Sequence, residues 1–114
     1  MAVPLPDGQT LFLIDLTYTV PLAEIAPLID DHMAWVQAHF DAGLFLVAGA
    51  KVPRSGGMIL ATAPDRGTIE AALPDDPFHR QGVATYDVTE FKPNTRAPGL
   101  FAPAPAIALG GGDG

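Results

Sequence analysis

The sequence predicts a small α+β domain with four strands and two main helices. At 114 residues, the chain is long enough for one hydrophobic core and too short for two. Its apolar residues switch between the two-residue period of strands and the three-to-four-residue period of helices, with glycine and proline between the segments. The expected order is a strand at 11–18, a helix at 21–42, strands at 44–48 and 58–62, a helix at 66–73 and a strand at 83–91.

The first strand is expected to lie in the centre of the sheet. Every second residue from Phe12 to Tyr18 is large and apolar, so these side chains form one face. The opposite face begins with Leu11 and Leu13. We therefore expect both faces to be covered, one by helices and the other by a partner subunit.

The first helix is expected to become regular only after an internal proline. Pro21 is acceptable in a first turn and Gly43 is typical of a helix end, whereas Pro27 lacks a backbone donor and should kink or interrupt the helix. The apolar positions at helical spacing are Ile25, Ile29, Val36 and Phe40.

Loop, cap and proline residues mark where the remaining helices and strands begin and end. A polar loop at 49–57 with two adjacent glycines should join the second and third strands. Asp65 is placed to cap the second helix, and Pro74 to end it. Asp76 precedes Pro77, which is typical of the cap and first turn of another short helix.

The resulting order βαββαβ is that of a ferredoxin-like fold, with a four-stranded antiparallel sheet and both helices on one face. The chain is 48% hydrophobic and only 17% charged, which suggests apolar surface meant for another chain. A homodimer that covers the bare sheet face would account for both features, and further assembly stays open.

Composition also limits the partners and the compartment. A net charge of −7 argues against binding a nucleic-acid backbone, and no apolar stretch is as long as a membrane span. There is no cysteine and no signal-peptide pattern at residues 1–7, so we expect a cytoplasmic protein. We expect one domain at 1–97, and a tail with little regular structure at 98–114 that is rich in proline and glycine.

His32 and Asp76 are the first candidates for chemistry. His32 falls within the apolar stripe of the first helix, where an imidazole needs a polar partner. By itself, the pattern favours a structural histidine. Asp76 has a sufficient structural role as a helix cap, but an aspartate there could also accept a hydrogen bond from a histidine and fix its tautomer.

Other candidate sites give weaker signals. Lys51, Arg54 and Ser55 could form an anion-binding edge beside the two glycines, but the pattern favours solvated loop residues. His39 would lie about 10 Å from His32 along a helix, and no metal-binding spacing is present, so neither a metal nor another cofactor is expected. Haem is a weaker possibility, since only the histidines could serve as axial ligands. The aromatic residues Trp35, Phe40, Phe78 and Tyr86 are expected in the core or in a pocket wall.

In the order and spacing of several segments, the chain resembles the YCII-related family of dimeric α+β barrel proteins. The resemblance covers residues 11–93. The segments that carry it are HMAWVQAHFDAG from His32, LFLVAGA from Leu44, Ser55-Gly56-Gly57, Asp76-Pro77-Phe78, Gly82-Val83 and Phe91-Lys92-Pro93.

The resemblance implies a sheet-paired dimer with a histidine and an aspartate in a pocket between the sheet and the helices. These two residues fall on His32 and Asp76, where the Asp-Pro-aromatic motif selects Asp76 over Asp75, and Ser55 matches a loop position of the pocket. The sequence departs from many members around Pro27, which affects the rim of the pocket. Relatives include a dehydrochlorinase of a chlorinated hydroxyhydroquinone, and muconolactone isomerases share the wider architecture.

The leading hypothesis is a cofactor-independent lyase or isomerase that acts on a small cyclic or anionic metabolite. His32 would be the general acid or base and Asp76 would orient it, while Arg54, Ser55 and Phe78 would bind the substrate. The alternative is a non-catalytic ligand-binding or accessory module, in which His32 and Asp76 only attach the helix to a loop. An open pocket beside the imidazole would favour chemistry, and a sealed pair would favour the structural role.

Overall fold

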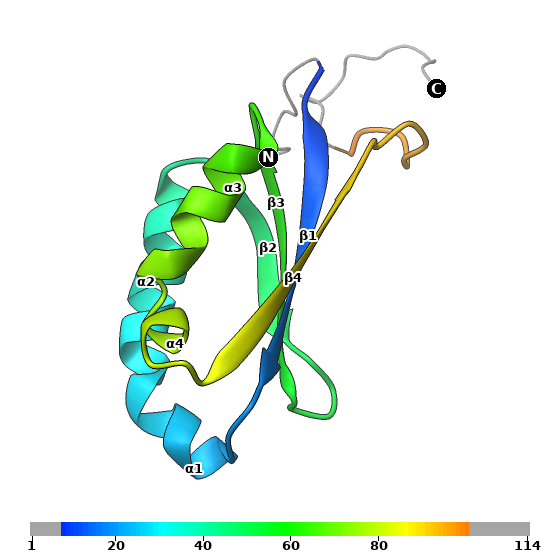
Figure 1. Cartoon of the computed structure of the whole chain (residues 1–114). Helices are drawn as coiled ribbons and strands as arrows, with labels where there is room; N and C mark the ends of the chain where they lie inside the picture. The colour runs from blue at the N-terminus through cyan, green and yellow to red at the C-terminus, as the bar shows by residue number, and fades with distance from the viewer. Residues whose placement is uncertain (1–7, 101–114) are drawn as a thin grey trace.

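The computed structural model describes residues 8–100, which form one antiparallel sheet and a layer of helices (Figure 1). The strands are β1 (Thr10–Tyr18), β2 (Phe45–Ala50), β3 (Gly56–Ala63) and β4 (Ala84–Phe91). The helical segments are α1 (Leu22–Ile25), η1 (Ala26–Leu28), α2 (Ile29–Asp41), α3 (Arg66–Ala72), η2 (Leu73–Asp75) and α4 (Pro77–Arg80). The strand order is β2-β3-β1-β4, with every neighbouring pair antiparallel. This arrangement confirms the predicted ferredoxin-like α+β fold.

The helices all lie on one face of the sheet, with α2 alongside α3 and α4 (Figure 1). On β1, the residues that alternate from Phe12 to Leu16 are buried under this layer, as predicted for a central strand. The buried side chains that form the core are Phe12, Ile14, Leu16, Ile25, Trp35, Val36, Phe45, Ile59, Ala61, Ala63, Ile69, Leu73, Phe78 and Val83.

The opposite face of the sheet carries the other set of alternating residues. Leu13 lies opposite Leu60 of β3, and the next pair along is Asp15 and Met58. Within residues 8–100, no helix covers this face (Figure 1). Val47, on the same face of β2, is 60% exposed.

The predicted helix at 21–42 is divided into three pieces. Pro27 lies inside the 3₁₀ turn η1, and the long regular helix α2 starts at Ile29. A proline in a helix interior removes a hydrogen bond and clashes with the preceding turn, so the expected interruption falls at this residue. The helix ends as predicted before Gly43, which adopts φ +80.

The second and third strands are longer than predicted and the loop between them is shorter. β2 includes Gly49 and Ala50, and β3 begins at Gly56, so the loop contains only residues 51–55. A Cβ on Gly56 would lie 1.8 Å from the backbone oxygen of Leu16. Gly56 is therefore a position of close strand approach rather than a loop residue.

The predicted helix caps are present. The Asp65 side chain accepts a hydrogen bond from the Thr68 backbone N–H at the start of α3, which lowers the pKa of its carboxyl group. The Asp76 side chain caps α4 in the same way through Phe78 N–H. Of the tail predicted at 98–114, residues 101–114 lie outside the part of the chain that the structure describes.

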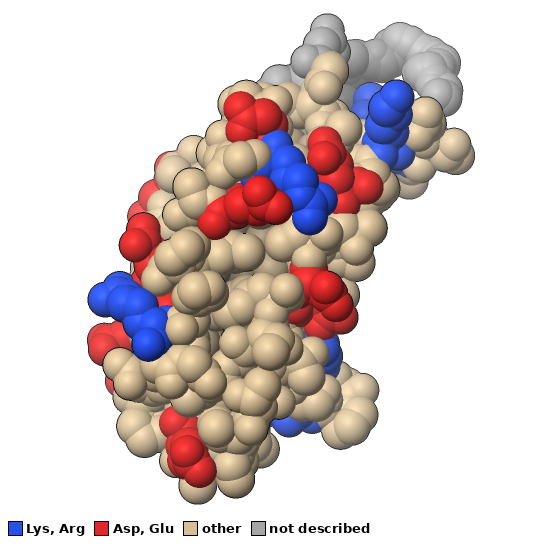
Figure 2. All heavy atoms as spheres, viewed as in Figure 1, with Lys and Arg blue, Asp and Glu red and all other residues tan. Residues whose placement is uncertain are grey.

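Charged side chains are spread over the surface. On the face drawn in Figure 2, basic side chains are separated from one another by acidic and uncharged ones. In the described part of the chain, no helix has both the length and the apolar character needed to cross a membrane.

Candidate functional site

Asp76 is the buried centre of the site. Its side chain is 0% exposed and lies in the turn between η2 and α4, where Pro77 starts the helix. One carboxylate oxygen, Oδ1, accepts the Phe78 backbone N–H at 3.1 Å and lies 2.8 Å from His32 Nδ1. A buried carboxylate needs such donors because it has lost its hydration.

His32 approaches this carboxylate from α2. Its imidazole is stacked on Phe78, with ring centroids 4.0 Å apart and an interplanar angle of 7°. Because Nδ1 faces an acceptor oxygen, the proton of a neutral ring is expected there, and Nε2 is then an acceptor. The His32 side chain is 14% exposed, so one edge of the ring remains accessible.

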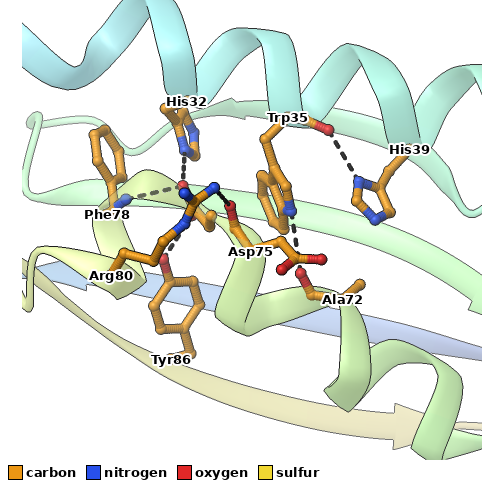
Figure 3. A network of polar contacts seen from close by, with 9 residues as sticks. His32, Trp35, His39, Ala72, Asp75, Phe78, Arg80 and Tyr86 are labelled. Atoms are coloured by element: carbon orange, nitrogen blue, oxygen red, sulfur yellow. Dashed lines mark hydrogen bonds and ion pairs between the residues drawn. The ribbon is translucent and has the colours of Figure 1, made fainter.

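Tyr86 of β4 is a third member of the site, although the sequence pattern indicated only a place in the core or in a pocket wall. Its hydroxyl donates to the second carboxylate oxygen of Asp76, Oδ2, at 2.5 Å. Burial, and then the hydrogen bond and the negative charge of Asp76, raise the pKa of Tyr86 above its ordinary value. Figure 3 shows His32 pointing down from α2 and Tyr86 pointing up from β4 toward the segment that carries Phe78. We call His32, Asp76, Phe78 and Tyr86 the Asp76 cluster.

A cavity of about 260 Å³ adjoins the exposed edge of His32. It lies between α2 and the β2–β3 hairpin, and it is open to the surface. The residues that line it are Leu16, Tyr18, Ile29, His32, Met33, Val36, Ala48, Gly49, Ala50, Arg54, Gly56, Gly57, Met58, Ile59 and Phe78. His32, Arg54 and the phenol of Tyr18 are its ionisable groups, and the rest of the wall is mostly apolar.

The β2–β3 loop brings only part of the predicted binding set to this cavity. Arg54 lines it, whereas Ser55 is exposed and is not among the lining residues. The Ser55 backbone oxygen accepts Tyr18 N–H at 2.9 Å, which ties the loop to the end of β1. At the start of the loop, Lys51 Nζ lies 2.5 Å from Asp15 Oδ1.

The other two histidines lie away from the cavity. His39 Nδ1 lies 2.9 Å from the Trp35 backbone oxygen, beside a second and more open groove between α2 and the η2–α4 segment. The His79 ring lies 5.4 Å from that of Tyr86. Among residues 8–100, no three histidine or acidic side chains are grouped as metal ligands would be.

The structure therefore brings together four of the five predicted site residues. His32 and Asp76 are in contact, Phe78 stacks on His32, and Arg54 lines the cavity that His32 also lines. A signal for Tyr86 is its position on the helix-facing side of the last strand, opposite Leu16. That position indicates a buried residue, but it does not reveal what its hydroxyl contacts.

Comparisons with known proteins agree with this architecture. The model of the YCII-related domain matches residues 11–92. A similar solved structure is the 5-chloro-2-hydroxyhydroquinone dehydrochlorinase from Burkholderia phenoliruptrix AC1100 in complex with 2,5-dihydroxybenzoquinone. It is 17% identical, with a TM-score of 0.63 over 72% of this chain and 93% of that chain. No curated protein sequence matches significantly. Since the family model spans most of the sequence, the chain belongs to the YCII-related domain family.

Proposed function

We propose that the protein is a cofactor-independent lyase or isomerase that acts on a small cyclic, anionic metabolite. The observation that carries this proposal is the position of His32, which lies between a buried carboxylate and an open cavity. A purely structural histidine would not need a cavity beside its ring.

In this proposal, Nε2 of His32 is the group that moves protons. It accepts a proton from the substrate as a general base, and Asp76 stabilises the imidazolium that forms. In an elimination, the leaving anion departs with the electron pair of its bond to carbon, and the proton goes to the imidazole. His32 then releases that proton to solvent or to the product, so no redox cofactor is required.

The size and lining of the cavity support a small ring as substrate. A cavity of about 150 Å³ accommodates benzene, so about 260 Å³ has room for one ring with a few substituents. The apolar wall suits the faces of such a ring. Arg54 would pair with an acidic substituent, and its neighbour Ser55 stays a predicted second contact from the same loop.

The dehydrochlorinase with the similar fold adds support for this class of substrate. The compound bound in that structure, 2,5-dihydroxybenzoquinone, is a single ring with acidic hydroxyl groups. It is therefore a suitable probe for the present cavity.

Binding and turnover can be tested separately. We expect 2,5-dihydroxybenzoquinone to raise the melting temperature of the full chain, and we expect chloride release from 5-chloro-2-hydroxyhydroquinone. His32→Gln should lower turnover by at least about 100-fold, the usual contribution of a general acid-base group. His39→Gln is the matched control, because His39 lies on the same helix outside the cavity.

Three outcomes would contradict parts of the proposal. Near-normal turnover by folded His32→Gln protein would exclude the acid-base role of the imidazole. Binding of the quinone without turnover of any ring substrate would favour the non-catalytic ligand-binding module. Failure to bind the quinone would contradict the proposed substrate class.

We further propose that two copies pair through the sheet face that carries no helix. Apolar side chains at this face support the pairing, among them Leu13, Leu60, Met58 and Val47. Sedimentation equilibrium should give a dimer for the wild type and a monomer for Leu60→Glu. A wild-type monomer at micromolar concentration would contradict this pairing.

A further inference from the structure

We propose that Tyr86 is a positioning residue, whose hydroxyl fixes the Asp76 carboxylate and thereby holds His32 in the tautomer with the proton on Nδ1. For its effect on catalysis, this inference rests on the proposed acid-base function. The inference about the tautomer stands on the geometry of the Asp76 cluster alone.

The hydrogen bond between Tyr86 and Asp76 runs from the phenol to the carboxylate. An ionised carboxylate only accepts hydrogen bonds, so the short contact of 2.5 Å requires the proton to be on the phenol. The raised pKa of Tyr86 agrees with this direction, because the phenol keeps its proton throughout the neutral range. Tyr86 is therefore a permanent donor to Oδ2.

The Tyr86 hydroxyl fixes the orientation of the Asp76 carboxylate. Oδ1 already accepts from Phe78 N–H and faces His32, so Oδ2 depends on Tyr86 for a partner. Three partners around a fully buried carboxylate satisfy both of its oxygens and prevent its rotation. Without the phenol, Oδ2 would be buried and unsatisfied, and the carboxylate would be free to turn to a new orientation.

The fixed carboxylate in turn selects the tautomer of His32. A charged and fixed Oδ1 at 2.8 Å selects the neutral imidazole with its proton on Nδ1, and Nε2 then has its lone pair free. A rotated Asp76 no longer makes this selection. The imidazole would then divide between its two tautomers, and the fraction ready to accept a proton at Nε2 would fall.

A purely structural role for Tyr86 makes a different prediction. Tyr86 also packs in the partly buried layer under the helices, and a phenylalanine would fill the same space. If packing were its only role, Tyr86→Phe would leave the tautomer of His32 unchanged. The substitution therefore separates the hydroxyl from the ring.

The chain offers a matched control for the loss of a hydroxyl donor. Thr10 Oγ1 donates to Glu90 Oε2 at 2.6 Å, so it makes a hydroxyl-to-carboxylate bond between β1 and β4. This bond is exposed, and it is six residues along β1 from Leu16 in the cavity wall, which is about 20 Å in a strand. Thr10→Val removes that hydroxyl and keeps the branched shape.

The experiment is nitrogen NMR of the full chain with ¹⁵N-labelled histidine, at a pH where His32 is neutral. We expect the wild type and Thr10→Val to show Nδ1 of His32 protonated and Nε2 unprotonated. In Tyr86→Phe, both nitrogens should shift toward the averaged values of mixed tautomers. Unchanged His32 nitrogens in folded Tyr86→Phe would overturn the proposal.

A second measurement covers the case in which Tyr86→Phe does not fold. In the wild type, we expect the hydroxyl proton of Tyr86 to exchange slowly with water and to give a resonance that shifts when His32 gains its second proton. In His32→Gln, that pH-dependent shift should be absent. A Tyr86 hydroxyl resonance that does not respond to His32 would overturn the proposal.

These readouts need no substrate, so they separate this inference from the proposed function. If no ring compound is bound or converted, the tautomer experiment still decides the role of Tyr86. If turnover is found, Tyr86→Phe should lower kcat by about 10-fold or more with little change in KM, because the hydroxyl does not touch the cavity. A change in KM alone would contradict the positioning role.

Discussion

Removing the Asp76 side chain should destabilise the protein much more than neutralising it. In Asp76→Ala, the Phe78 N–H loses its partner in a buried position, and the donors of His32 and Tyr86 lose theirs at partly buried ones. An orphaned buried donor costs about 1–3 kcal/mol, and partial access to water reduces the effect for two of the three. We therefore expect the free energy of unfolding to fall by about 3–5 kcal/mol, a large part of the 5–15 kcal/mol that is typical of small proteins.

Asp76→Asn should have a smaller effect because an amide can keep all three contacts. Its oxygen can accept from Phe78 N–H and His32, while its NH₂ group donates to the Tyr86 oxygen after the hydroxyl rotates. Only the additional strength that the negative charge gives these hydrogen bonds is lost. We therefore expect the free energy of unfolding to fall by about 1–2 kcal/mol.

The assay is urea unfolding at pH 7, followed by the fluorescence of Trp35, the single tryptophan. Asp75→Ala is the control, since that side chain is exposed and its loss should change stability by less than about 0.5 kcal/mol. Equal losses for Asp76→Asn and Asp76→Ala would refute the argument from hydrogen-bond partners. So would a loss below about 1 kcal/mol for Asp76→Ala.

Two further predictions concern alkaline pH and the glycines of the hairpin. The raised pKa of Tyr86 means that the unfolded chain releases this proton first, so stability should fall as pH rises above about 10, and it should fall less steeply in Tyr86→Phe. Parallel urea midpoints of the two proteins between pH 9 and pH 11 would contradict this. Gly56→Ala should prevent normal pairing of β1 and β3, because its Cβ would overlap the Leu16 carbonyl, whereas Gly49→Ala meets no atom within 4 Å and should be tolerated. Thermal unfolding of both variants checks this pair, and equal melting temperatures would exclude a steric role for Gly56.

Local patterns in the sequence were sufficient to predict the order of the strands and helices. The alternation along β1, Gly43 after the long helix and the caps at Asp65 and Asp76 each depend on residues close in the chain. Such features are governed by backbone geometry and by hydrogen bonds within one turn, so the sequence displays them directly. The interruption at Pro27 was expected for the same reason.

Features that depend on contacts between distant segments could not be predicted. Gly56 was expected in the loop because glycine usually marks turns. Its role is instead to leave room for the Leu16 carbonyl of β1, about forty residues earlier in the chain. The hydroxyl of Tyr86 contacts a carboxylate ten positions away, across a turn whose path the sequence does not specify. The resemblance to a family pointed to His32 and Asp76 as partners, whereas composition and spacing alone favoured separate structural roles.

The position of Tyr86 on β4 has a consequence for biosynthesis. The ribosome makes His32 and Asp76 before it makes the closing strand, so a nascent chain can hold both residues while the phenol donor has not yet docked. Only the finished domain contains all three partners in register. The complete set of hydrogen bonds around Asp76 should therefore form late in cotranslational folding, when the carboxyl-terminal edge of the sheet is in place.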